Sequence, residues 1–321
     1  MTFINDSESL ESVIVTNSPE VSVIVVTYNQ NLSKTIRTLE SIVIQENVSF
    51  EIIICDDGSE KCFEKDIREF FSKTDFCRYS LVFHEHNGGT VSNYYSGLTK
   101  AKGRYSKLLG SGDCLVDRKT LYNWVHFMND NNVVWSFSDT IYYRFVNGKA
   151  IPFQTKAMPQ VIRPYITRNK AKCAWNYIVL HDIANGASIL GVTHIQKEYC
   201  EVLKEKGIRY CEDLIYKLMM FYGEVGDYYP STTVYYEYGD GISSSGDLAW
   251  RGRILEDKHK LDQIMFAKKD DSAFQGKLVN GLVRNSKSNK LNKFFIKGRP
   301  FLWIKQHFFP RLTNIPDEVG E

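Results

Sequence analysis

Apolar and polar positions follow two different rhythms along the first part of the chain. Residues 21–27 form an apolar run rich in β-branched side chains between polar segments, which is typical of a strand covered on both faces. Residues 33–46 instead place apolar side chains at helical spacing, with Ser33 available as the N-cap. By the same criteria, we predict further strands at 51–55, 80–85 and 104–109, and further helices at 66–73 and 90–102, the last closed by Gly103. This order predicts parallel βαβ units, whose ligands bind at the carboxyl ends of the strands.

The alternation fades beyond Asp117, which is placed to cap a helix that buries its apolar face. Longer loops and isolated strands such as 133–137 follow. We therefore expect this part of the chain to complete a site that the first part begins. The composition changes again near residue 250.

The composition narrows the classes of function. With 321 residues, of which 43% are hydrophobic, the chain can bury a large core. A net charge of +2 gives no overall attraction to nucleic acid, so we expect no nucleic-acid partner. The seven cysteines are odd in number and form no CxxC pair, which disfavours a disulfide framework or a structural zinc site and fits a reducing cytosol. The polar, acidic start and the lack of about 18 consecutive apolar residues predict neither a signal peptide nor a membrane span.

Polar motifs follow the predicted strands. Asp56 and Asp57 come directly after a buried strand and precede Gly58, so either a ligand site or an ordinary Asp-Gly turn is expected there. The motifs that occur in order are VTYN at 26–29, DDGS at 56–59, NGGTVSN at 87–93, AKG at 101–103 and GSGD at 110–113. The ordered set is far more specific than any one of its members.

This ordered set resembles the family 2 glycosyltransferases. The resemblance implies a GT-A type α/β fold, in which a parallel or mixed nucleotide-binding sheet is flanked by helices and joined to an acceptor-binding half and a mostly helical C-terminal extension. It also implies inverting transfer of a sugar from a nucleotide sugar, of the kind used in bacterial surface-polysaccharide synthesis. A weaker likeness covers NGAS at 185–188, CEDLIYKL at 211–218 and YYEYGDGISSSG at 235–246. The expected segments are an N-terminal extension at 1–19, a nucleotide-sugar-binding half at 20–116, an acceptor and catalytic half at 117–248, and a basic aromatic extension at 249–321.

The resemblance assigns the donor to the strand ends. A carboxylate such as Asp56 can only accept hydrogen bonds, so it suits the ring N–H of uracil or thymine better than cytosine. Backbone at the start of a helix near Asn87 could approach phosphate closely. The residues expected to bind the donor are Thr27, Tyr28, Asn29, Asp56, Asp57, Asn87, Gly88, Gly89, Asn93, Ser111 and Gly112.

The resemblance also implies a divalent metal, Mg²⁺ or Mn²⁺, on the diphosphate. Gly110 and Gly112 stand where the family usually has acids, and Asp113 alone remains as the expected metal ligand. One carboxylate is sufficient for Mg²⁺ when phosphate oxygens complete its shell. The alternative is that Asp113 only caps a turn, and Glu237 or Asp240 are further possible oxygen ligands.

The resemblance assigns Asp213 as the catalytic base. A carboxylate opposite the leaving group can accept the proton of the attacking hydroxyl, which gives a one-step displacement with inversion. Glu212 and Asp213 also suit the first turn of a helix, where negative charge is favourable, and both roles can hold together.

The last part of the chain is basic and aromatic. Residues 272–316 contain no Asp or Glu and interleave Lys and Arg with Phe and Trp. This composition predicts either contact of 285–311 with a membrane surface or a solvated basic face packed on the catalytic domain. We expect a cytoplasmic protein, with peripheral attachment to the inner face of the cytoplasmic membrane as the first of these alternatives.

Three functions compete at this point. The first is an inverting, metal-assisted glycosyltransferase that uses a uridine-linked donor and a glycan or lipid-linked acceptor. The second is a non-catalytic nucleotide-sugar-binding or scaffold protein, which the depleted acidic motif would explain. The third, a nucleic-acid-binding module built on the basic tail, lacks a recognisable motif.

Overall fold

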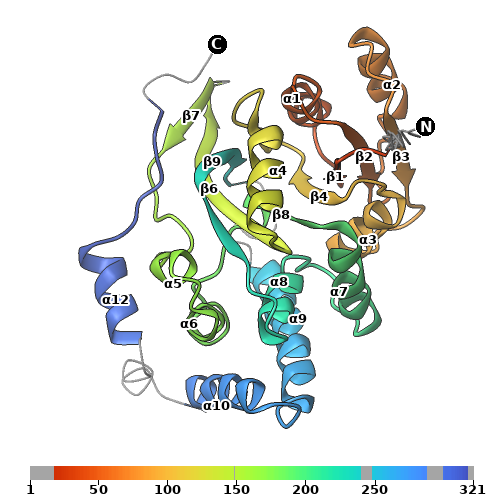
Figure 1. The fold of residues 1–321 in the computed structure, drawn as a ribbon. Coiled ribbons are helices and arrows are strands. Elements are labelled where there is room, and N and C mark those ends of the chain that lie inside the picture. The colour runs from red at the N-terminus through yellow and green to blue at the C-terminus, as the bar shows by residue number, and fades with distance from the viewer. Residues whose placement is uncertain (1–17, 148, 240–247, 288–298, 317–321) are drawn as a thin grey trace, which may run out of the picture.

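A computed structural model describes residues 18–147, 149–239, 248–287 and 299–316 (Figure 1). Within these residues a nine-stranded sheet has the order β3-β2-β1-β4-β8-β6-β9-β5, with β7 paired to β6. The strands are β1 (Val21–Thr27), β2 (Phe50–Asp56), β3 (Tyr79–Phe83), β4 (Tyr105–Gly110), β5 (Cys114–Leu115), β6 (Trp135–Val146), β7 (Lys149–Phe153), β8 (Ile189–Val192) and β9 (Asp227–Glu237). The helices are α1 (Leu32–Val43), α2 (Glu64–Lys73), α3 (Thr90–Lys100), α4 (Thr120–Asn131), α5 (Arg163–Ile166), α6 (Lys170–Ala174), α7 (Thr193–Glu205), α8 (Leu214–Phe221), α9 (Leu248–Ala267), α10 (Ala273–Lys287) and α12 (Arg299–Phe308), with a π-helix at Trp175–Val179 and a 3₁₀ helix at Gly186–Ser188.

The register of the first four strands brings the predicted motifs to one edge. β1 pairs in parallel with both β2 and β4, and Thr27 stands opposite Asp56. Because the carboxyl ends of parallel strands meet at the same edge, the residues after β1, β2 and β4 lie together. β8 then pairs antiparallel with β4, so the sheet is mixed and runs on into the second half of the chain.

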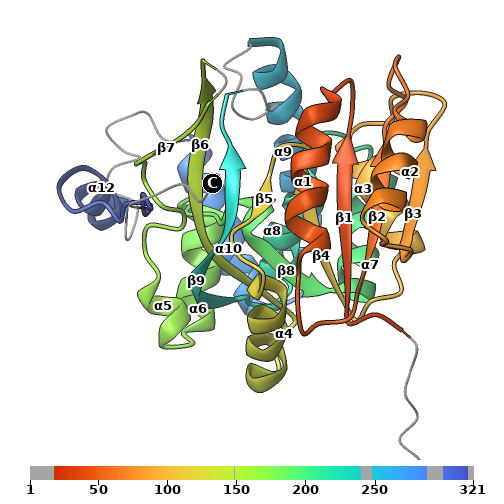
Figure 2. The ribbon, with the colours of Figure 1, turned by 90° about the horizontal axis from the view of Figure 1, so that it is seen from above.

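Helices cover both faces of this sheet (Figure 2). Neighbouring positions of β1 point to opposite faces, since Ile24 belongs to one buried cluster and Val23 to the other. The cluster around Val23 includes side chains of α1, α2 and α4, and the cluster around Ile24 includes side chains of α3, α7 and α8. Two buried faces explain why β1 is mainly apolar, with only Ser22 and Thr27 as polar side chains, rather than alternating.

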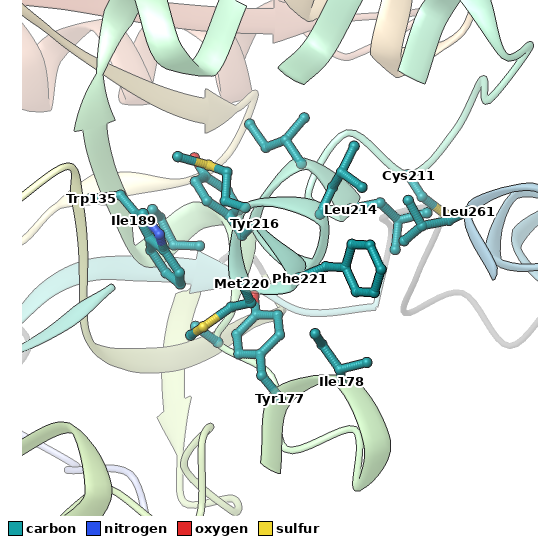
Figure 3. Close-up of a cluster of buried hydrophobic side chains, with 14 of the residues drawn as sticks. Trp135, Tyr177, Ile178, Ile189, Cys211, Leu214, Tyr216, Met220, Phe221 and Leu261 are labelled. Carbon is teal, nitrogen blue, oxygen red and sulfur yellow. The ribbon is translucent and has the colours of Figure 1, made fainter. Parts of the chain in front are cut away.

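Helix α8 is buried on every side. All eight of its residues are buried, and Figure 3 shows Leu214, Tyr216 and Phe221 among side chains from β6, β8, the π-helix and α9. A helix whose residues are all buried, with its one lysine, Lys217, paired to Asp262 at 3.1 Å, is typical of a core element. The residue just before it, Asp213, is therefore held by a rigid support.

Several helix ends differ from the prediction. α1 begins two residues earlier than predicted, with Asn31 rather than Ser33 as the N-cap, because Asn31 Oδ1 accepts the Ser33 amide at 2.9 Å. α3 ends at Lys100, and Gly103 does not serve as its C′ residue. Gly103 instead donates its amide to Ser22 Oγ at 2.8 Å, in a space where a Cβ would lie 2.4 Å from the Ser22 nitrogen.

The region after residue 248 is mostly helical, as predicted, with α9, α10 and α12. α9 packs against α8 and so joins this region to the core. Among the described residues, no helix is both long and apolar enough to cross a bilayer. Residues 1–17, 240–247 and 288–298 lie outside the described part, and with them Asp240 and part of the 285–311 segment.

Candidate functional site

A cavity of about 330 Å³ opens at the carboxyl ends of β1 and β4 and the start of α3. Of the residues predicted to bind donor or metal, those that line it are Thr27, Tyr28, Asp57, Asn93, Ser111 and Asp113. Asp56 and Ser59 line a smaller space that shares Thr27 and Gln30 with this cavity. The structure therefore brings the first, second and fourth strand-end motifs together around one hollow.

Asp56 is oriented by hydrogen bonds from its own motif and from β1. Thr27 Oγ1 donates to Asp56 Oδ2 at 2.7 Å. The amide and hydroxyl of Ser59 donate to the same carboxylate at 2.8 and 2.6 Å. The DDGS motif therefore forms the ordinary turn that was one of the two expectations. This turn also fixes a carboxylate at the rim of the site.

Asp57 holds the loop that leads into α3. Its two carboxylate oxygens accept the amides of Gly88 and Gly89, each at 2.8 Å. These amides are thus bonded to Asp57 rather than free for phosphate. Gly89 has φ +89°, and a Cβ there would lie 2.5 Å from the carbonyl oxygen of Arg209, so this turn requires glycine.

Arg209 joins this loop to the segment that carries Asp213. Its guanidinium donates to the carbonyls of Asn87 and Gly88 at 3.0 and 3.3 Å. Its own carbonyl accepts the Val91 amide of α3 at 3.0 Å. The donor-side loop and the 209–213 segment are therefore bonded directly to each other.

Asp257 of α9 supports the same segment from the other side. Its buried carboxylate accepts the Tyr210 amide at 2.6 Å and the Arg209 amide at 3.2 Å from both oxygens. Buried backbone amides need such partners. The 209–213 segment is thus held between α3 and α9.

Asn93 is the site residue with an unused acceptor. It is 2% exposed, and its Nδ2 donates to the Cys55 and Thr27 carbonyls at 3.0 and 3.4 Å. Its Oδ1 is buried without a hydrogen-bond partner in the described structure, although the side chain lines the cavity. Buried polar atoms are nearly always satisfied, so this oxygen marks a place for a ligand donor.

Asp113 is buried at the cavity wall. Its oxygens accept the Gly110 and Glu237 amides at 3.2 and 3.1 Å, and burial raises its pKa to about 7, against the lowering effect of these two bonds. The turn-capping role and the site position thus occur together. The positive charge of nearby Lys107 also opposes this rise in the pKa of Asp113.

Glu237 of β9 occupies the space that an acid in place of Gly112 would need. A Cβ on Gly112 would lie 2.2 Å from Glu237 Oε2, and Gly112 has φ +107°. The Glu237 carboxylate pairs with Lys34 at 2.8 Å and with Arg37 at 3.4 Å. The missing side chain at Gly112 therefore leaves room for Glu237, and the carboxylate at this place comes from a distant strand.

The 185–188 segment lies next to Asp213 and contacts Lys107, whose charge acts on Asp113. The Lys107 ammonium donates to the carbonyl of Ala187, and burial lowers the pKa of this lysine to about 7. A Cβ on Gly186 would lie 3.3 Å from the Cβ of Asp213. The small residues of the NGAS segment are thus next to the predicted base.

Asp213 immediately precedes α8 but makes no side-chain capping hydrogen bond. Burial raises its pKa, with Lys258 opposing the shift. Burial, followed by the charge of Asp213, raises the pKa of neighbouring Glu212 to about 7, and Thr90 bonds to that glutamate. Because Thr90 also lines the cavity, it connects the hollow to the Glu212–Asp213 pair.

Some predicted residues lie at the margin, and some lining residues were not predicted. Asn29 donates its backbone amide to Ser59 Oγ and does not line the cavity. Nor is the cavity lined by the predicted residues Asn87, Gly112 and Asp213. The lining residues that sequence analysis did not assign are Val26, Gln30, Lys34, Thr90, Gly110, Tyr236 and Trp250, with Glu237 considered only as a further ligand. The position of Lys34 just after the first strand was an available signal, whereas nothing local marks Trp250.

The comparisons with known proteins identify the family. A model of glycosyl transferase family 2 matches residues 22–190, which is more than half of the chain. The chain belongs to glycosyl transferase family 2. The family assignment made from the strand-end motifs is therefore confirmed.

Curated relatives match over shorter stretches. An uncharacterized glycosyltransferase of Rickettsia bellii is 35% identical over 125 residues, which is 39% of this chain and 17% of the relative. The Escherichia coli UDP-Glc:alpha-D-GlcNAc-diphosphoundecaprenol beta-1,3-glucosyltransferase WfaP is 35% identical over 120 residues, 37% of this chain and 45% of that protein. The match spans a quarter or less of the length of the first relatives.

Solved structures share the fold. Staphylococcus aureus TarS 1–349 in complex with UDP-GlcNAc aligns with a TM-score of 0.54 at 17% identity, over 89% of this chain and 79% of that one. The same protein without ligand gives a TM-score of 0.52 at 18% identity. Together with the mixed, helix-flanked sheet, this confirms the predicted GT-A fold class.

The donor set at Asp113 fits a divalent metal only when phosphate is present. Among the described residues, no group of three or more His, Cys, Asp or Glu side chains could hold a metal by itself. Mg²⁺ keeps several waters and takes one or two carboxylates together with substrate phosphates. Asp113 on the cavity wall, with Glu237 beside it, meets that lower requirement.

Proposed function

We propose that this chain is an inverting glycosyltransferase that moves a sugar from a uridine-diphosphate-linked donor to a glycan or lipid-linked acceptor. The observation that carries the proposal is a pair of carboxylates: Asp113, buried at the cavity wall, and the half-buried Asp213 beside the 185–188 segment. In this proposal Asp113 acts at the diphosphate and Asp213 at the attacking hydroxyl. Family membership supports the same reaction class.

The donor's base and ribose belong at the ends of β1 and β2. Asp56 offers acceptor oxygens for the uracil ring N–H, and Thr27 and Ser59 hold it in place. The unpartnered Oδ1 of Asn93 accepts from a donor hydroxyl. TarS has been solved with UDP and with UDP-GlcNAc, and WfaP carries UDP-Glc in its name, which supports a uridine nucleotide here.

Departure of the nucleoside diphosphate requires charge neutralisation. Asp113, with Glu237 as its neighbour, would hold Mg²⁺ or Mn²⁺, which supplies this neutralisation when bound. Lys34 adds a fixed positive charge at the cavity wall. Because Gly110 has no side chain, the diphosphate can approach the backbone of Gly110 and Ser111 closely.

Asp213 accepts the proton of the attacking hydroxyl. Its raised pKa makes it a stronger base than an ordinary aspartate, and the charge of Lys258 opposes this rise. The buried α8 behind it and the bonds of the 209–213 segment limit its movement. Attack from the side opposite the diphosphate inverts the configuration at the anomeric carbon.

Replacing Asp213 by Asn tests the proposal. The variant keeps the size of the side chain but cannot accept the proton, so transfer should fall by about 100-fold or more while donor affinity changes little. Donor affinity is measured by calorimetry with UDP-sugars and Mn²⁺, and transfer by release of UDP. Asp117→Asn, an exposed aspartate outside the cavity, is the matched control.

The same experiment separates the catalytic proposal from the non-catalytic alternative. A sugar-nucleotide-binding protein without turnover would bind donor equally in wild type and Asp213→Asn, and neither would release UDP above the uncatalysed rate. Equal UDP release by both proteins would remove Asp213 as the base.

A further inference from the structure

A second cavity, of about 550 Å³, lies outside the donor site. It is bounded by α6 and the π-helix on one side and by α10 and α12 on the other. Its walls are mainly apolar, with Val161, Trp175, Leu180, Phe274, Leu278 and Leu302. Its volume falls within the range of small-molecule sites, and nothing in the proposed transfer reaction uses it.

Two cations stand at this cavity. Lys172 of α6 and Lys277 of α10 both line it and are exposed to solvent, so their ammonium groups can remain hydrated at its mouth. No described lining residue is acidic. An apolar interior with a cationic entrance matches a molecule that has a hydrocarbon body and an anionic head.

Helix α12 continues this surface outward. Leu302 is 5% exposed and faces the cavity, whereas Phe301 and Phe308 are 60% and 65% exposed. Trp303 and Ile304 are 42% and 43% exposed, and Phe309 beyond the helix is 71% exposed. Single exposed apolar residues are ordinary, but this many within nine positions mark an interaction surface.

The charge around α12 selects the kind of surface. Lys305 of α12 accompanies the exposed aromatic residues, with Lys172 and Lys277 at the cavity beside them, whereas Arg311 is paired with Asp139; the chain from 272 to 316 has no acidic residue. Aromatic residues at the level of lipid headgroups with cations beside them are the pattern of helices that lie on anionic membranes. A nucleic acid would also attract the cations, but it would leave the large aliphatic and aromatic area exposed to water.

We propose that α12 lies on an anionic lipid bilayer and that the cavity behind it takes a hydrocarbon chain of a phosphate-bearing lipid, with Lys172 and Lys277 at the phosphate. The inference deepens the proposed function, because it names a lipid with a phosphate head as the class of acceptor anchor. Only the statement that this lipid anchors the acceptor rests on the proposed function. Binding of the lipid requires no sugar transfer and is tested without a donor.

Tryptophan fluorescence provides the test, because the two parts of the surface each carry a tryptophan. Trp175 lines the cavity and Trp303 lies on the exposed face of α12. Trp124 and Trp135 are fully buried in the core, and Trp250 lies at the donor cavity. The full chain is mixed with vesicles of phosphatidylglycerol brominated in the acyl chains, using unbrominated vesicles as the reference.

The expected result is quenching of both reporters. Trp303→Phe leaves Trp175 as the reporter of chain entry, and Trp175→Phe leaves Trp303 as the reporter of surface contact. Ala171→Phe, which places a ring at the exposed rim of the cavity, should abolish quenching of Trp175 and preserve that of Trp303. The double variant Lys172→Glu and Lys277→Glu should weaken vesicle affinity about tenfold or more, since each lysine near an anionic surface contributes substantially.

The controls fix the meaning of each outcome. Lys119→Glu with Lys206→Glu makes the same charge change at exposed lysines outside the cavity and should leave vesicle binding close to wild type. Quenching of Trp303 without Trp175 would overturn chain entry, and quenching of neither would overturn the whole inference. Equal binding to neutral phosphatidylcholine vesicles would overturn the role of the lysines. UDP release by the same preparation tests the proposed function independently of these results.

Discussion

Removing the Asp257 carboxylate should lower catalysis from a position outside the donor cavity. Asp257→Ala leaves the buried amides of Arg209 and Tyr210 without their acceptor. Hydrogen bonds to charged groups contribute about 1.5–3 kcal/mol each, so the expected loss in the free energy of unfolding is about 3 kcal/mol. The freed 209–213 segment would also misplace Asp213, so kcat should fall at least about tenfold while the donor KM changes little.

Two variants of the same helix serve as controls for this prediction. Met265→Ala removes a fully buried side chain of α9 and should cost about 2–5 kcal/mol without touching the 209–213 segment. Glu256→Ala removes an exposed partner of Lys260 and should be neutral. Thermal unfolding gives stability, and UDP release gives kcat and KM. If Asp257→Ala and Met265→Ala lose stability equally and keep the same kcat, the positioning role of Asp257 is refuted.

Two further predictions concern Asp113 and its surroundings. Gly112→Ala should destabilise the protein by about 1–3 kcal/mol and weaken donor binding, because the new Cβ would lie 2.2 Å from the Glu237 carboxylate. The control is Gly207→Ala, at φ +69° with no atom within 4 Å of the new Cβ. It should show only the backbone cost of about 1 kcal/mol in thermal unfolding. Equal losses in the two variants would contradict the role of Glu237. The raised pKa of Asp113 stabilises the metal-free protein fully below its ordinary value of 3.8, and this contribution is lost as the pH rises to about 7. Asp113→Asn should therefore flatten the pH dependence of stability in that window. In the wild type, the affinity for Mn²⁺ with UDP should increase as the pH rises through about 7, because the metal requires the ionised carboxylate. Calorimetry at several pH values checks both, and an unchanged pH dependence in Asp113→Asn would contradict them.

The first four strands and their motifs could be predicted from the sequence because their information is local. An apolar run of β-branched residues covered on both faces is visible in seven residues, as at Val21–Thr27. Parallel pairing then places whatever follows each strand at one edge, so Thr27, Asp56 and Asp113 did not need a structure to be grouped. The helix ends were less accurate, because Asn31 caps α1 in place of Ser33, and Ser22 of the distant strand β1 accepts the Gly103 amide.

The supports of the site depend on contacts between distant parts of the chain. Glu237 fills the space left by Gly112 across 125 positions of sequence, and Asp257 bonds a segment 47 residues earlier. No local pattern marks Asp257, and the motif at 235–246 marked Glu237 only as a possible metal ligand. Arg209, with an ordinary basic side chain on a loop, likewise gains its role only because α3 and the 209–213 segment fold against each other.

The most direct test of the account is a crystal structure of the protein with a UDP-sugar and Mn²⁺. We predict the uracil at Asp56 and Thr27, a donor hydroxyl at Asn93 Oδ1, the diphosphate at Asp113, and the anomeric carbon facing Asp213 across the 185–188 segment. A donor bound elsewhere, or one whose anomeric carbon faces away from Asp213, would contradict it.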